Sequence, residues 1–332
     1  MGAVSQAWPA ICGGIKMKSG RAFEIFVKTL LINVGFSEVK SDGLYIFDGS
    51  PGQMIQGLGE AHNADVLLEP PVQTPFLSPA RLLIECKDYS KKVGLNTLRS
   101  ALGLREDINH FDIVDMKELS ARKSQRRKGI IYKYQRFSYQ VAVAALNGYT
   151  VQAQKFAVTH RIPLLAFDKM PFWNRFMKMF ENIINSEDAD DIEIEAGIME
   201  LANDIGDRIA MAITDSGQML FLYRIYGDTN GFSDDYFLHW ENPERPWPLV
   251  SGGQRYLFQL PDHIMKQWLS NAESGIEMRI RAIDYKERFF SNMIVYYSEG
   301  GRPAIKMISI DQYELEKAKR RFENGSDEGE RQ

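Results

Sequence analysis

The chain has 332 residues, of which 44% are hydrophobic, 25% charged and 11% aromatic, and its formal net charge is −4. This composition is that of a globular protein with enough apolar material for a core, and the length predicts two domains. No apolar run approaches the roughly 18–20 residues of a membrane span. Two distant cysteines, Cys12 and Cys86, argue against a disulfide framework or a zinc site, so a reducing cytoplasm is the expected location.

Charge is divided unequally between the two halves of the chain. Residues 1–170 hold 22 Lys and Arg against 15 Asp and Glu, a net charge of +7. The remaining residues hold 18 against 29, a net charge of −11. A basic half inside an acidic protein favours a polyanion partner for that half, although chance variation of surface charge would produce the same difference.

The elements predicted first along the chain are a helix and a series of strands. Residues 18–34 carry apolar side chains at helical spacing, with Ser19 as the N-cap and Gly35 as the stop. A short strand is predicted at 44–47. Residues 48–60 contain four glycines and a proline and predict turns or a loop. Two stronger strands are predicted, separated by a proline-rich stretch without regular structure, at residues 64–68 and 81–87.

The rest of the first half predicts a helix-covered sheet. Residues 95–119 are expected to be partly helical, and a basic run occupies 121–128. A buried strand at 139–146 is followed by a helix that Thr150 caps and by a last strand at 162–167. This alternation of strands and helices predicts an α/β domain whose sheet is covered by helices.

The second half predicts a β-rich α+β domain at 195–322. Residues 171–194 are expected to form a linker or helix, and residues 323–332 a disordered tail. The predicted strands are 217–227, 254–259, 275–284, 289–298 and 303–310. The predicted helices are 195–213, 261–271 and 311–322.

Three residues of the first half carry a recognisable chemistry. Residues i and i+2 of a strand share a face, so Glu85 and Lys87 point the same way and Cys86 points to the other side. If the strands at 64–68 and 81–87 pair, Asp65 and Glu85 converge at one sheet edge. Two carboxylates there favour Mg²⁺ or Mn²⁺, and the ammonium of Lys87 beside them completes a set suited to phosphodiester hydrolysis.

The spacing of Asp65, Glu85 and Lys87, with the strand LLIECKDYSKKV and the later stretch YQVAVAALNGYTVQAQKFAVTHRIPLLAF, resembles the PD-(D/E)xK nuclease superfamily and its Mrr-type members. The resemblance covers residues 15–170 and implies a restriction endonuclease-like domain, a central mixed sheet flanked by helices. Asp65 follows Ala64 instead of the proline of the superfamily name. The resemblance also implies a third acidic residue on the first helix, and Glu24 is the candidate, although a plain polar position beside a helix face explains it equally well.

Two further features are candidates for contacts with nucleic acid. His62 precedes Asp65 by three residues, and as a lone histidine it favours a structural position over a phosphate contact. A basic cluster inside the nuclease-like half is predicted to contact phosphates, with a solvated loop as the alternative. Its members are Arg122, Lys123, Arg126, Arg127 and Lys128.

The sequence therefore predicts a Mg²⁺- or Mn²⁺-dependent DNA endonuclease without a membrane segment. A role in restriction or defence against foreign DNA comes from the resemblance alone. Because cutting two strands needs two sites, the resemblance also suggests a homodimer. Two alternatives stay open: a repair or recombination nuclease for branched or single-stranded DNA, and a degenerate nuclease fold that binds nucleic acid or protein without cutting.

Overall fold

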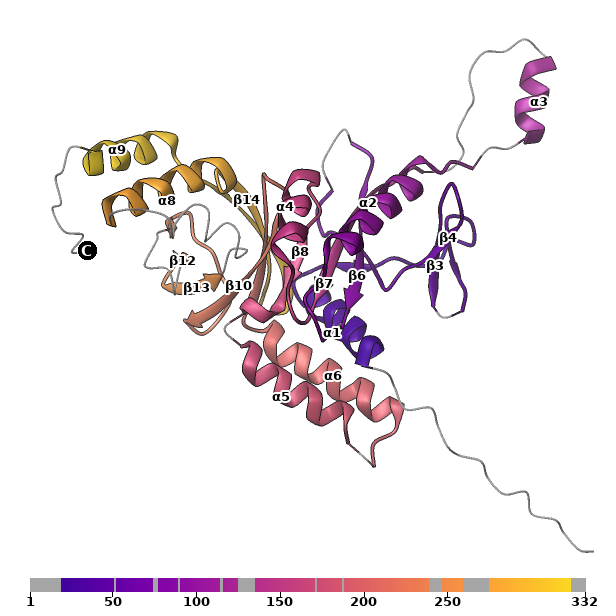
Figure 1. Cartoon of the computed structure of the whole chain (residues 1–332), viewed down its shortest axis with the longest axis horizontal. Helices are drawn as coiled ribbons and strands as arrows, with labels where there is room; N and C mark the ends of the chain where they lie inside the picture. The colour runs from indigo at the N-terminus through magenta and orange to yellow at the C-terminus, as the bar shows by residue number, and fades with distance from the viewer. Residues whose placement is uncertain are drawn as a thin grey trace, which may run out of the picture.

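The computed structural model describes residues 19–50, 52–73, 77–88, 90–113, 116–124, 135–170, 172–186, 188–238, 247–258 and 275–323. It is a mixed α/β protein, and within these residues the strands form a five-stranded, a seven-stranded and a three-stranded sheet. None of the described helices has the length and apolar character to cross a membrane. Figure 1 shows the seven-stranded sheet on one side of the five-stranded sheet and the three-stranded sheet on the other.

The five-stranded sheet has the order β1-β5-β6-β7-β8. β5 pairs antiparallel with β1 and β6, while β7 pairs parallel with β6 and β8, so the sheet is mixed. The strands are β1 (Ser37–Glu38), β5 (Val66–Glu69), β6 (Ala80–Lys87), β7 (Ser138–Ala145) and β8 (Leu164–Ala166), the last followed by the 3₁₀ turn η1 (Phe167–Lys169). This arrangement confirms the two neighbouring strands and the later strand pair that the sequence predicts.

Helices cover both faces of this sheet. Successive strand residues point to opposite sides, and β6 carries apolar residues on both sides, so each face packs against helices. Leu83 of β6 belongs to the core under the helices α2 (Leu95–His110) and α4 (Val151–His160). Its neighbours Leu82 and Ile84 belong to a second core, which contains α1 (Ser19–Asn33). The helix α3 (Met116–Ser124) lies away from these layers in Figure 1.

The predicted helix boundaries rest on local backbone chemistry. Gly35 has φ +106° and ends α1: its N–H donates to Ile32 and the N–H of Phe36 donates to Leu31, the pair of hydrogen bonds of a Schellman cap. The hydroxyl of Thr150 accepts the N–H of Ala153 at 3.3 Å and begins α4. Both predictions are confirmed.

The stretch 48–60, predicted as turns or a loop, instead contains the central strand of the three-stranded sheet, whose three strands are antiparallel. The strands of this sheet are β2 (Ile46–Asp48), β3 (Gln53–Gln56) and β4 (Ala61–Asn63). The sequence signal is weak because Ile55 is the one buried residue of β3. This small sheet forms the chain's approach to Asp65.

The region 171–194 is helical at two places. α5 (Trp173–Ile184) and α6 (Asp191–Gly206) pack on each other, and α6 packs along α1. The core that contains α1 also includes Phe176, Ile194 and residues of the second sheet such as Phe221. The first two-thirds of the chain therefore shares a hydrophobic core with the seven-stranded sheet.

The seven-stranded sheet is antiparallel throughout, in the order β11-β12-β13-β10-β9-β14-β15. Its strands are β9 (Ile209–Thr214), β10 (Met219–Tyr226), β11 (Tyr236–Leu238), β12 (Trp247–Ser251), β13 (Gln254–Phe258), β14 (Asn292–Glu299) and β15 (Arg302–Ser309). The helices α8 (Gly275–Phe289) and α9 (Gln312–Glu323) lie beside it.

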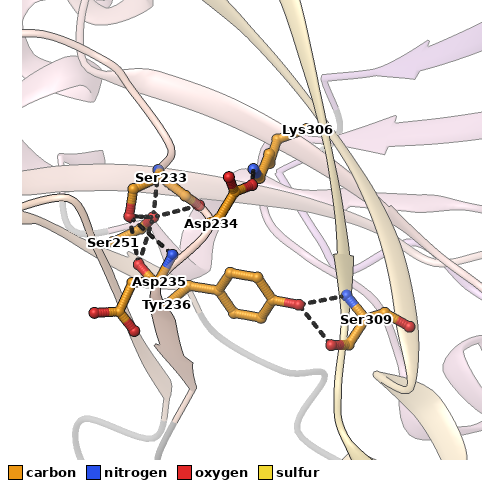
Figure 2. Close-up of polar contacts among 7 residues, drawn as sticks. All are labelled: Ser233, Asp234, Asp235, Tyr236, Ser251, Lys306 and Ser309. Atoms are coloured by element: carbon orange, nitrogen blue, oxygen red, sulfur yellow. Dashed lines mark hydrogen bonds and ion pairs between the residues drawn. The ribbon is translucent and has the colours of Figure 1, made fainter.

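The two edge strands of this sheet are bridged by side chains, as Figure 2 shows. The hydroxyl of Tyr236 in β11 accepts the N–H of Ser309 in β15 at 2.8 Å and donates to its carbonyl at 2.5 Å. Asp234, just before β11, pairs with Lys306 of β15. The sheet therefore curls until its first and last strands meet, and the bridged backbone of Ser309 is not available to a strand from another chain.

Two predictions in the second half are wrong. Residues 275–284 form the start of α8 and not a strand, because Met278, Ala282 and Tyr285 follow a helical spacing and pack into the core of the sheet. The predicted helix 195–213 ends at Gly206, and the apolar run that follows is β9. The expected helix 261–271 and the tail after Glu323 lie outside the described residues.

Candidate active site

The register of β5 and β6 brings two predicted carboxylates together. Val66 pairs with Ile84 and Leu67 with Leu83. Continuing this register by one residue, just before β5 begins, sets Asp65 opposite Glu85. Directly opposed residues of antiparallel strands share a face, with Cβ atoms about 4.5–5.5 Å apart. The strand pairing that the sequence required is therefore present.

The carboxylate of Asp65 is held by two donors. The backbone N–H of Cys86 donates to Oδ2 at 2.9 Å, and Nδ2 of Asn63 donates to Oδ1 at 3.1 Å. Burial raises the pKa of Asp65, whereas the Cys86 N–H, the charge of Lys87 and the Asn63 amide each lower it. The net shift of the pKa is upward, so burial outweighs these donors and the ionised carboxylate is less favourable than it would be in water.

Lys87 lies beside the two carboxylates. Its Nζ is 3.1 Å from Oε2 of Glu85, and the two side chains are 21% and 20% exposed. Cys86, between them in sequence, turns to the opposite face and packs on the core that contains α1. The alternation predicted for Glu85, Cys86 and Lys87 is confirmed, and most of the Lys87 side chain is enclosed.

Glu24 reaches the same cluster from α1. Burial is the main cause that raises its pKa; a hydrogen bond from Arg21 at 2.9 Å lowers it, and the nearby charge of Asp65 raises it again. Lys87 also acts on Glu24 electrostatically. The structure therefore places the third acidic candidate close enough to interact with Asp65 and Lys87.

Two grooves meet at these residues. The first, here the α1 groove, has a volume of about 970 Å³ and is lined by Glu24 and Asp65. The second, here the α2 groove, has a volume of about 750 Å³ and is lined by Glu85 and Asp107. Asn63 lines both grooves, so the acidic cluster is open to solvent on two sides.

The donor set fits a hard divalent cation with few protein ligands. Across the described residues, no group of three or more His, Cys, Asp or Glu side chains is arranged to hold a metal. Mg²⁺ commonly takes only one or two carboxylates and completes its shell with water and phosphate oxygens. Asp65 and Glu85, opposed at the end of the strand pairing, are the two carboxylates that could hold such an ion.

The basic cluster is only partly described. Lys123 lies exposed at the end of α3, which also carries Arg122, and α3 is well separated from β6 in Figure 1. Arg126, Arg127 and Lys128 lie outside the described residues. The described part therefore places no member of this cluster beside the carboxylates.

Two features of the site were not foreseen from sequence. Asn63 is two residues before Asp65, and only the turn out of β4 aims its amide at that carboxylate. His62 is not alone, because Asp107 of α2 lies 2.6 Å from its Nε2. Neither relation has a sequence signal, since the partners depend on how the hairpin folds over α2.

No family model, curated protein or solved structure matches the chain. The site is therefore interpreted from its own geometry and from the motif resemblance.

Proposed function

We propose that the chain is a Mg²⁺- or Mn²⁺-dependent DNA endonuclease of the PD-(D/E)xK kind. The observation that carries the proposal is the register that, continued by one residue, sets Asp65 opposite Glu85 at the end of the β5–β6 pairing, with Lys87 next to Glu85. A mixed sheet with helices on both faces supports the restriction endonuclease-like fold that the motif implies.

Each side chain has a distinct task in phosphodiester hydrolysis. Asp65 and Glu85 would hold a divalent cation, which would supply Lewis acidity for the phosphoryl oxygen and lower the pKa of a water. Asn63 and the Cys86 N–H orient Asp65 by donating to its two carboxylate oxygens. Lys87 stabilises the negative charge that builds up on the phosphoryl oxygens during attack. Glu24 orients the attacking water from the α1 side.

The charge of the first half supports DNA as the substrate, since phosphate contacts supply most sequence-independent affinity. The cluster Arg122, Lys123, Arg126, Arg127 and Lys128 is proposed to make such contacts. A homodimer would bring two sites to the two strands. The restriction or defence role follows the Mrr-type resemblance alone.

The test removes one carboxylate charge at a time. Asp65→Asn and Glu85→Gln should abolish cleavage and weaken Mn²⁺ binding measured by calorimetry, while circular dichroism and the melting temperature stay near wild type. Glu106→Gln, on the exposed side of α2, is the matched control and should change neither. Plasmid, linear, single-stranded and branched DNA should each be assayed with Mg²⁺, Mn²⁺ or EDTA.

The outcomes separate the competing functions. Preferred cleavage of branched or single-stranded DNA would favour a repair or recombination nuclease. DNA binding without Mn²⁺ binding or cleavage would identify a binding module and contradict the proposal. A charge-neutral variant that cuts at the wild-type rate would show that the carboxylates are assigned incorrectly.

A further inference from the structure

His62 and Asp107 form a pair across two elements that flank the α2 groove. His62 lies in β4 and Asp107 in α2, and Nε2 is 2.6 Å from Oδ2. The N–H of Gly59 donates to the other carboxylate oxygen at 2.9 Å. Both oxygens of Asp107 are therefore engaged, and the imidazole is held in one orientation.

The turn before β4 is shaped to let this pair form. A Cβ on Gly57 would lie 2.1 Å from Oδ2 of Asp107 and 2.8 Å from Nε2 of His62. Only a residue without a side chain leaves room for the carboxylate to reach the ring at this point. The close approach is consequently built into the hairpin.

The tautomer follows from the charge of Asp107. Hydrogen bonds from His62 and from Gly59 hold the pKa of Asp107 below its usual value, so the carboxylate is ionised and can only accept. Nε2 of His62 must then carry the proton of this hydrogen bond. The other ring nitrogen, Nδ1, has no hydrogen-bond partner among the described residues.

The pair shares its groove with a proposed metal ligand. His62, Glu60, Glu85 and Asp107 all line the α2 groove, and they are its titratable side chains. Imidazole is the side chain that gives and takes protons near neutral pH, whereas carboxylates are ordinarily ionised there. His62 therefore brings an imidazole into the groove that Glu85 lines, whereas Glu24 lines the α1 groove.

We propose that His62 is the general acid of the phosphodiester hydrolysis and that Asp107 is its positioning residue; this inference rests on the proposed nuclease function. The attacking water forms a new P–O bond while the P–O bond to the departing nucleoside breaks. In this step the ring starts doubly protonated: the departing oxygen takes the proton from Nδ1, which leaves a neutral ring whose Nε2–H still donates to Asp107. The proton lost by the attacking water passes to solvent, and solvent returns a proton to His62.

The competing explanation makes the pair a clamp that only ties the hairpin to α2. His62→Gln distinguishes the two, because a glutamine amide can still donate to Asp107 but cannot give up a proton. General acids contribute about 10²–10⁴-fold to rate. Single-turnover cleavage by His62→Gln should fall by that amount at saturating DNA, while Mn²⁺ affinity and DNA affinity in Ca²⁺ stay unchanged. His110→Gln, at the exposed end of the same helix, is the matched control.

The decisive substrate has sulfur in place of the bridging oxygen that departs during cleavage. The cleavage position is mapped first, which shows whether this is the 3′ or the 5′ oxygen. A thiolate departs without a proton, so wild type and His62→Gln should cut the leaving-group-sulfur substrate at similar rates. Asp107→Asn should show a smaller loss on the oxygen substrate and the same recovery. A readout apart from activity is the ¹⁵N spectrum of His62, in which an oligonucleotide with Ca²⁺ should shift Nδ1 more than Nε2.

Each remaining result overturns the inference. If His62→Gln cleaves DNA at the wild-type rate, the pair only ties the hairpin to α2, and the nuclease proposal is not affected. An equal defect on oxygen and sulfur substrates would exclude leaving-group protonation, and an unmoved Nδ1 signal would place the ring away from the phosphate. A wild-type protein that cuts no DNA would overturn the nuclease proposal, and this one with it.

Discussion

Asp65 depends on donors from two different segments of the chain. The Cys86 N–H comes from the neighbouring strand β6 and the Asn63 amide from the end of β4. The strand supplies its donor from the backbone, so no substitution at Cys86 other than proline removes it. The Asn63 amide can be removed by a single substitution, which makes it the sensitive point of the arrangement.

The first prediction concerns pH and Asn63. Burial raises the pKa of Asp65, and donation from Asn63 lowers it. Asn63→Ala should raise this pKa further, so protons compete with Mn²⁺ up to a higher pH. On acidification, the variant should begin to lose Mn²⁺ affinity at a higher pH than the wild type does. Calorimetric Mn²⁺ titrations from acid to neutral pH measure the effect. The exposed Asn96→Ala is the control, and an unshifted curve for Asn63→Ala would show that the amide does not act on Asp65.

The second prediction concerns Lys87. If its ammonium stabilises the transition state, Lys87→Ala should lose about 10²–10³ in single-turnover rate and keep metal and DNA affinity. Lys87→Arg should restore the rate only in part, because a planar guanidinium does not replace a compact ammonium. A Lys87→Ala protein that binds DNA poorly in Ca²⁺ but cuts normally at saturation would show a ground-state anchor instead.

At the scale of elements, the site forms where the pairing between β5 and β6 stops, at Val66 and Ile84. β6 continues three residues past Ile84, where it still pairs with β7 but no longer with β5. Glu85 and Lys87 lie on this end of β6, and Asp65 lies just before β5. α1 is held against the sheet by apolar packing, and this packing carries Glu24 to the cluster. The end of α1 in turn contacts the second sheet, because Gly35 lies against Pro303 of β15.

The third prediction tests that contact between elements. Gly35 and Gly43 both have positive φ, +106° and +74°, so an alanine at either is strained by about 1–2 kcal/mol. A Cβ on Gly35 would also lie 2.8 Å from the Cβ of Pro303, whereas nothing lies within 4 Å of one on Gly43. Gly35→Ala should therefore lower the free energy of unfolding more than Gly43→Ala does, as measured by denaturant titration. Equal losses would mean that the Pro303 ring moves aside freely.

At the scale of the whole molecule, charge and core follow different divisions of the chain. The part of the chain up to residue 170 has a net charge of +7 and the part after it a net charge of −11. One hydrophobic core nevertheless continues from α1 through α5 and α6 into the seven-stranded sheet. The acidic half is consequently packed against the basic half, and DNA affinity is expected to come from the first half alone.

The fourth prediction tests this division of charge. Reversing Arg126, Arg127 and Lys128 to Glu should weaken DNA binding. The slope of log affinity against log salt should fall by about 0.9 for each phosphate of duplex DNA that the variant no longer binds. Reversing Lys317, Arg320 and Arg321 in α9 changes the net charge equally and should leave the slope near wild type. Equal slopes for the two triple variants would contradict a phosphate-binding role for the first cluster.

Much of this organisation could be predicted from sequence because it is local. The apolar period marks α1 and β6, Gly35 and Thr150 mark helix ends, and the i, i+2 spacing places Glu85 and Lys87 on one face. The same local reasoning failed at α8, where the apolar residues fit a strand period over 275–284 and only burial of Met278, Ala282 and Tyr285 selects the helix.

Tertiary structure alone decided which of these elements meet. A period of apolar residues tells which face of a strand is buried but not which strand lies beside it, because pairing depends on packing between segments far apart in sequence. The opposition of Asp65 and Glu85, the approach of Glu24, the His62–Asp107 pair and the bridge from Tyr236 to Ser309 all follow from such pairing. The sequence by itself determined the chemical groups, and the fold determined their neighbours.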